Sequence, residues 1–267
     1  MDDLNALDPI DRARKAVSDR ADLPGMSLME HLEELRKRIF HSLGFLIVGF
    51  VIAYIFHGRL YGLVRAPLDI NHIALNFTHP TDGLNLTLKT ALVGGCILAG
   101  PFILYQVWLF ISPGMYANEK KYVVPFMGAT VGLFLAGVYF GYRWVLPNAI
   151  KVLVFDFGVK LGIVPILTIE DYTGFFMSVI LGLGICFELP ILMFFLALFG
   201  IADGKFFLKQ YRYAILVIFL VSAIICPLPD PVSMCLFASP MLALYVLGCG
   251  VAFLVHPNRN KKELKAS

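Results

Sequence analysis

Two carboxylates, Glu34 and Glu119, have the types and positions to bind a ligand that carries two positive groups. Glu34 belongs to a predicted helix, and Glu119 belongs to a short loop between two long apolar stretches. A planar guanidinium pairs with a carboxylate through two parallel hydrogen bonds, so this pair suits a ligand with two guanidinium groups. The simpler alternatives are an ordinary i,i+4 pair between Glu34 and Arg38, and a solvated loop carboxylate at Glu119.

The helix that carries Glu34 is predicted over residues 27–38. Ser27 and Glu30 have the spacing of a capping box, which favours a helix start at this point. At about 100° per residue, His31 and Glu34 lie on one flank of an apolar face. We therefore expect an amphipathic helix on the cytoplasmic surface of a membrane.

A third carboxylate, Glu188, lies inside an apolar stretch. It is the only charged residue between Asp171 and Asp203, and a rise of about 1.5 Å per residue places it near the middle of a membrane span. One interpretation is a protonated side chain that bonds backbone carbonyls left without donors by Pro190. The other is a polar point on a pathway or docking face, which intramembrane carboxylates usually mark.

No catalytic motif accompanies these carboxylates. The chain contains no H-E-x-x-H, no G-x-S-x-G and no glycine-rich phosphate loop, so hydrolysis and nucleotide chemistry are not expected. Its five cysteines lie in apolar stretches without a C-x-x-C pair, and neither a metal site nor a cofactor is predicted. We therefore expect a protein that is not an enzyme.

The elements that must position these residues are membrane helices. Of the 267 residues, 58% are hydrophobic and 15% are charged, which excludes a soluble globular domain. The net charge of only +3 argues against a nucleic-acid partner. The predicted fold class is an all-α integral membrane protein, in which the fifth span is short for a bilayer. Six transmembrane helices are predicted, at residues 39–56, 88–111, 123–146, 172–199, 213–226 and 232–255.

The distribution of positive charge predicts the orientation and the domain organisation. Most of the 22 Lys and Arg residues fall on the side that holds both termini, so both termini are expected in the cytoplasm. Residues 1–26 are polar and mixed in charge, which favours a flexible cytoplasmic arm. Residues 27–256 are expected to form one six-helix membrane domain, followed by a cytoplasmic tail at 257–267.

Several motifs along the chain are distinctive when they occur together. They are HLEELRKR at 31–38, RAPL at 65–68, THP at 78–80, LYQVWLFISPGMY at 104–116, NEKK at 118–121, FELP at 187–190 and PLPD at 227–230. Together they resemble the TatC family, the polytopic subunits of the twin-arginine protein translocase. The resemblance covers residues 27–256.

The resemblance implies a six-helix, concave, glove-like protein of the bacterial inner membrane, with both termini in the cytoplasm. It implies a receptor that binds the twin-arginine motif in the signal peptides of folded precursor proteins. Glu34 and Glu119 match the carboxylates that recognise this motif, and Arg36 and Phe110 match further positions that receptor activity or architecture needs. The implied partners are the single-span subunits TatB and TatA and further copies in a receptor complex, with transport driven by the proton gradient.

Other positions match the family outside the recognition motif. Glu188 matches its buried intramembrane carboxylate, Pro67 matches a position needed for activity or architecture, and Asp230 matches the acid in the turn before the last span. Met234 stands where the family often has Gln, so the resemblance does not extend to a second polar element near Glu188. The alternative function is a secondary transporter of small molecules or ions, which would favour an internal symmetry that this chain does not show.

Overall fold

The protein folds into helices that are joined at one point by a short pair of strands. The computed structural model describes residues 28–70, 73–111, 123–156, 166–226 and 231–266. The strands β1 (Leu75–Asn76) and β2 (Leu167–Thr168) pair in parallel. The helices are α2 (Leu28–Ile55), α3 (His57–Asp69), α4 (Asp82–Ile111), α5 (Val123–Phe140), α6 (Leu146–Ile150), α7 (Ile169–Cys186), α8 (Leu189–Leu198), α9 (Gly204–Lys209), α10 (Tyr211–Ile225) and α11 (Pro231–Ala266), with π-helical turns η3 (Gly141–Val145) and η4 (Lys151–Asp156) on either side of α6.

Among the described residues, five helical stretches are long enough and apolar enough to cross a membrane. They are Met29–Ile55, Asp82–Ile111, Phe126–Phe155, Ile169–Leu198 and Pro231–Phe253. The mostly helical membrane architecture predicted from the sequence is therefore confirmed. The remaining predicted span corresponds to α10, which has 15 residues and a length of about 22 Å, less than the roughly 30 Å of a hydrocarbon layer.

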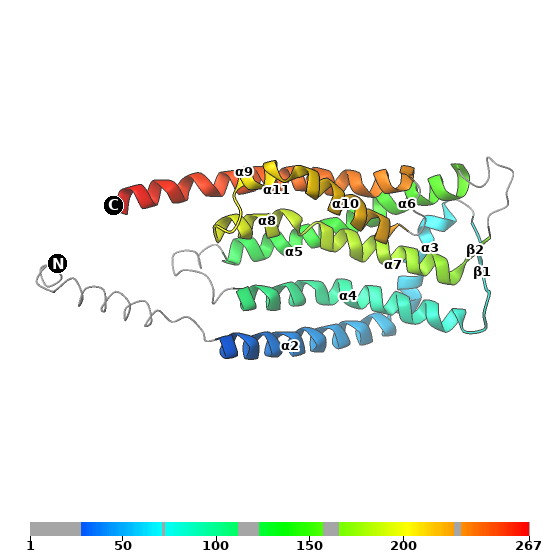
Figure 1. The fold of residues 1–267 in the computed structure, drawn as a ribbon. Coiled ribbons are helices and arrows are strands. Elements are labelled where there is room, and N and C mark those ends of the chain that lie inside the picture. Colours follow the sequence, from blue (N-terminus) through cyan, green and yellow to red (C-terminus); the bar gives the residue numbers. More distant parts are fainter. Residues whose placement is uncertain (1–27, 71–72, 112–122, 157–165, 227–230, 267) are drawn as a thin grey trace, which may run out of the picture.

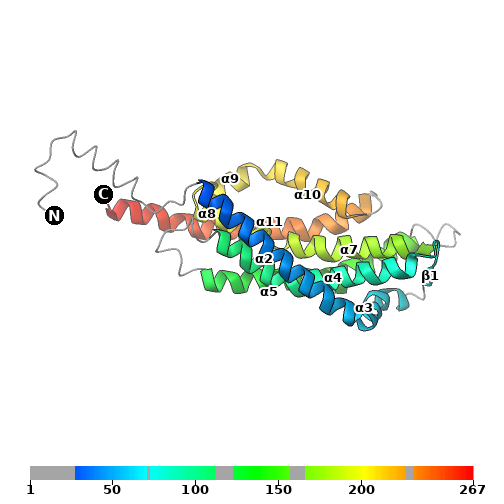
Figure 2. The ribbon, with the colours of Figure 1, turned by 90° about the horizontal axis from the view of Figure 1, so that it is seen from below.

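The long helices run side by side along one axis, as Figures 1 and 2 show. Helices α2 and α4 pack along each other at one side of the bundle, and α8 to α11 lie at the other side (Figure 1). The start of α2 and the end of α11 lie at the same end, whereas β1, β2 and α3 lie at the opposite end (Figure 1).

The core is built around α7. Tyr172 and Leu183 on this helix are almost fully buried, and they belong to a hydrophobic cluster that also includes Leu68 of α3, Leu146 of α6 and Phe237 of α11. Close packing of such side chains provides dispersion attraction, which holds helices together inside a membrane. Helix α7 therefore connects the two sides of the bundle.

The predicted surface helix over residues 27–38 is not a separate element. Residues 28–38 are the first turns of α2, which continues without interruption to Ile55. No Pro or Gly occurs between residues 28 and 43, so nothing in the sequence breaks the helix where the membrane span was expected to begin. The amphipathic segment is therefore the end of a long membrane helix.

The structure adds detail to three further expectations. The predicted loop after the first span contains α3, because Val64, Pro67 and Leu68 provide one apolar, buried face. The predicted fourth span is present as Ile169–Leu198, with a local interruption between α7 and α8, where Pro190 lies in the first turn of α8 and suits a helix start. Helix α11 continues beyond residue 256 to Ala266, so residues 257–266 of the predicted tail are helical.

Candidate functional site

Glu34 lies in the first turns of α2 and pairs with Arg38 on the same helix. Arg38 Nε donates a hydrogen bond to Glu34 Oε1 over 2.7 Å, and Arg38 Nη2 contacts the same oxygen. The i,i+4 pair predicted as the simpler alternative is therefore present. Both contacts use Oε1, so Oε2 takes part in neither. The two side chains are only 18% and 22% exposed, which shields their charges more than those of an open surface pair.

Gln106 connects this pair to α4. Arg38 Nη1 donates to Gln106 Oε1 over 3.1 Å, and the Gln106 side chain is buried. Sequence reasoning did not single out Gln106, although it is the only amide in the apolar part of α4. A lone buried amide needs a hydrogen-bond partner, and that requirement is the signal that could have identified it.

Phe110 and His31 close the end of the same interface. Their ring centroids lie 4.4 Å apart with an interplanar angle of 22°, so the two rings stack across α2 and α4. Phe110 is one of the residues that the resemblance selected. The structure thus places Phe110 beside the turn of α2 that carries Glu34.

A groove begins at these polar residues and follows the α2–α4 interface. Its volume is about 320 Å³. Its walls are apolar apart from Arg38, Gln106 and Ser42, and the lining residues are Leu35, Arg38, Ile39, Ser42, Leu43 and Leu46 of α2 with Ile103, Gln106, Val107 and Phe110 of α4. A carboxylate at one end of an apolar groove can bind a cationic group that precedes an apolar segment.

Not every predicted residue joins this site. Arg36 is exposed and lies over its own helix, with its guanidinium carbon 5.7 Å from the centre of the Phe40 ring. Glu119 lies outside the described residues, so its pairing with Glu34 stays a prediction. Asp230 also lies outside the described residues.

Glu188 lies at the break between α7 and α8. Its backbone N–H donates to Ile185 O over 3.0 Å, and its carbonyl accepts from Leu192 N over 2.9 Å. Its Oε1 atom is buried and has no hydrogen-bond partner within the described parts of the chain. The hydrogen bonds to free carbonyls that the simpler interpretation requires are therefore not formed by Oε1. An unsatisfied carboxyl oxygen at this depth is costly, which is typical of a functional position.

Comparison with known proteins places this arrangement in a family. The family model described as "Sec-independent protein translocase protein (TatC)" matches residues 30–240. A protein of the same description from Koribacter versatilis (strain Ellin345) is 47% identical over 266 residues, which cover 97% of this chain and 96% of that protein. This chain belongs to the TatC family. A TatC protein from Deinococcus radiodurans is 37% identical over 234 residues, 85% of this chain and 86% of the relative.

The same family has a solved structure of closely similar fold. The "Crystal Structure of Twin Arginine Translocase Receptor- TatC" superimposes with a TM-score of 0.77 at 33% identity, covering 85% of this chain and 99% of that chain. The resemblance noted from the motifs is thereby confirmed. TatC proteins are components of a protein translocase, so this chain is a membrane transport protein and not a catalytic enzyme.

Proposed function

We propose that this chain is the signal-peptide receptor and core subunit of a twin-arginine translocase. The observation that carries the proposal is Glu34, a shielded carboxylate paired with Arg38, which lines the apolar α2–α4 groove. A signal peptide presents a positive segment followed by 7–15 apolar residues, the order in which this site offers a carboxylate and then apolar walls. Membership of the TatC family favours this receptor over the small-molecule transporter.

Binding exchanges one guanidinium for another at Glu34. An arginine of the signal peptide displaces Arg38 from the carboxylate, and Arg38 retains its hydrogen bond to Gln106. After the exchange, the signal-peptide arginine is bonded to Glu34 and Arg38 is still bonded to Gln106. The free-energy cost of displacing Arg38 is therefore low. Glu119 is proposed to bind the second arginine of the motif. Phe110 forms the wall beside Glu34, and Arg36 acts on the outward face of α2.

The proposed orientation places both termini in the cytoplasm of a bacterial cell, with six spans in the inner membrane. The start of α2 and the end of α11 lie at the same end of the bundle, which supports this orientation (Figure 1). The proposed partners are TatB, TatA and other copies of the receptor. Transport of the precursor is proposed to be driven by the proton gradient. Glu188 is proposed as a polar position on a surface that these partners or the precursor contact inside the membrane.

Substitution of Glu34 tests the receptor directly. In the purified chain in nanodiscs, Glu34→Gln should weaken binding of a twin-Arg signal peptide by roughly ten- to a hundredfold, because a charge-assisted pair contributes about 1–3 kcal/mol. It should weaken binding of the Lys-Lys peptide much less, because an ammonium cannot make the bidentate contact. The measurement is a titration of each labelled peptide, and Glu119→Gln should behave in the same way.

Glu33→Gln is the matched control, because Glu33 is an exposed acid on the neighbouring position of α2. It should leave the affinity for both peptides unchanged. Equal losses of affinity for the two peptides in Glu34→Gln would mean that the carboxylate supplies only a general negative field. No loss for either peptide would reduce Glu34 to a structural partner of Arg38.

A further inference from the structure

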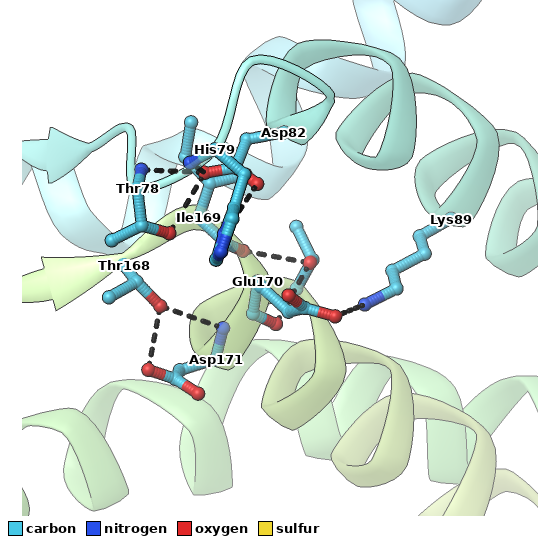
Figure 3. A network of polar contacts seen from close by, with 9 residues as sticks. Thr78, His79, Asp82, Lys89, Thr168, Ile169, Glu170 and Asp171 are labelled. Atoms are coloured by element: carbon cyan, nitrogen blue, oxygen red, sulfur yellow. Dashed lines mark hydrogen bonds and ion pairs between the residues drawn. The ribbon is translucent and has the colours of Figure 1, made fainter.

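At the end of the bundle opposite the groove, two segments far apart in the chain are held side by side. The parallel pairing of Leu75 with Leu167 and of Asn76 with Thr168 aligns them. The first segment continues through residues 77–81 into α4, and the second leads directly into α7. Polar side chains from both segments therefore meet at the beginnings of these two helices, as Figure 3 shows.

Asp82 is the buried centre of this polar group. Its Oδ2 atom accepts hydrogen bonds from Thr78 N at 2.7 Å, His79 N at 2.9 Å and Thr78 Oγ1 at 3.1 Å. The residue is only 1% exposed, yet Oδ1 has no hydrogen-bond partner among the described residues. A buried carboxylate oxygen without a hydrogen bond costs free energy, so Oδ1 is available to accept a further ligand.

Two further metal-binding groups surround that oxygen. His79 Nδ1 lies 3.8 Å from Asp82 Oδ1. Glu170 lies in the first turn of α7, close to both residues, with its carboxylate paired to Lys89 (Figure 3). One ligand atom each from His79, Asp82 and Glu170 lie within 4.8 Å of one another. The histidine and the glutamate are exposed, so their side chains can close the small remaining gap without moving the helices.

We propose that His79, Asp82 and Glu170 bind a divalent transition-metal cation of the Zn²⁺ type. One imidazole nitrogen and two carboxylate oxygens are ligands that Zn²⁺ accepts at about 2.0–2.2 Å. Three protein ligands leave the fourth tetrahedral position for water. The hydrogen bonds on Asp82 Oδ2 orient the carboxylate, as surrounding groups commonly do for a metal ligand.

Lys89 is the competing cation at this site. Its Nζ lies 3.6 Å from Glu170 Oε1. The N-termini of α4 and α7 each contribute about half a positive charge. Together with the charge of Lys89, they nearly neutralise the two negative charges of Asp82 and Glu170. Lys89 therefore competes with the metal for Glu170. The bound cation would tie the beginning of α4 to the beginning of α7, on the side that faces away from the cytoplasm in the proposed orientation.

Metal titration of the full chain tests the site. The protein is purified in detergent, stripped with a chelator and titrated with ZnCl₂ by calorimetry. One saturable site is expected, and His79→Ala should weaken it at least about tenfold because it removes a ligand. Lys89→Met should tighten it, because it removes the competing charge. His57→Ala is the control, since His57 is an exposed histidine whose Nδ1 lies 2.9 Å from Tyr54 O at the end of the preceding helix α2. This variant should bind Zn²⁺ as the unmodified chain does.

Cobalt(II) separates this site from the five cysteines. With only nitrogen and oxygen ligands, bound Co²⁺ should show visible ligand-field bands without the near-ultraviolet thiolate band. A thiolate band, unchanged affinity in His79→Ala, or no tightening in Lys89→Met would each overturn the proposal.

Discussion

At the scale of single residues, Gly95 sets the distance between the two helices that form the groove. A Cβ on Gly95 would lie 2.7 Å from the backbone N and Cα of Phe50. Gly49 is equally restricted, because its Cβ would lie 2.7 Å from Gly95 O. Small residues at such contacts allow membrane helices to approach closely. The Arg38–Gln106 bond depends on this approach, since its two partners belong to different helices.

We therefore expect Gly95→Ala to lower the free energy of unfolding by about 1–3 kcal/mol, the usual cost of an added methyl group that backbone atoms oppose. The measurement is thermal unfolding of the purified chain in detergent. Gly44→Ala is the control on α2, because nothing lies within 4 Å of its Cβ position, and it should not destabilise the protein. Equal unfolding temperatures for both variants would show that the helices do not need this contact distance.

At the scale of an element, α3 contains a proline whose missing hydrogen bond is replaced from another helix. Pro67 lies inside α3 and has no N–H to donate to Leu63 O, its partner four residues earlier. Tyr142 Oη of η3 donates to that carbonyl over 2.9 Å. A second tyrosine, Tyr172 of α7, donates to Val64 O over 2.6 Å. These two bonds attach α3 to the bundle.

A double-mutant cycle measures the replacement at Leu63 O. Tyr142→Phe should lower the free energy of unfolding by about 1–2 kcal/mol while Pro67 is present. In a Pro67→Ala background the backbone supplies its own donor, so the same substitution should cost much less. Unfolding in detergent gives the coupling between the two positions. Additive effects would mean that the hydroxyl does not substitute for the missing N–H.

At the scale of the whole molecule, α10 is the edge that we expect a partner to cover. The helix is short for a bilayer, and it exposes Tyr213, Leu216, Leu220 and Ile224. Contact with a partner helix would relieve the cost of matching so short a span to the bilayer. We propose the transmembrane helix of TatB or TatA as that partner.

Cysteine crosslinking in membranes tests this edge, in a chain whose five native cysteines are replaced. Leu220→Cys should crosslink to a cysteine in the partner span, because Leu220 is 58% exposed. Ile218→Cys is the control on the same helix, since Ile218 is 4% exposed and faces the core. Crosslinks from α4 or α5 with none from any exposed position of α10 would contradict the assignment.

The sequence by itself determined the membrane character, the positions of the apolar helices and the family. These follow from composition and local patterns, because a bilayer demands long apolar stretches wherever the chain crosses it. The helical pair of Glu34 and Arg38 was also predictable, since residues four apart on a helix are neighbours.

Only the tertiary structure decided what these residues meet. Gln106 bonds Arg38, Tyr142 bonds Leu63 O, and Glu170 lies near Asp82, because helix packing and the β1–β2 pairing bring distant segments together. The burial of one face of α3 also depends on that packing. No local pattern encodes which distant partner a side chain finds, because that choice depends on how all the helices fit at once.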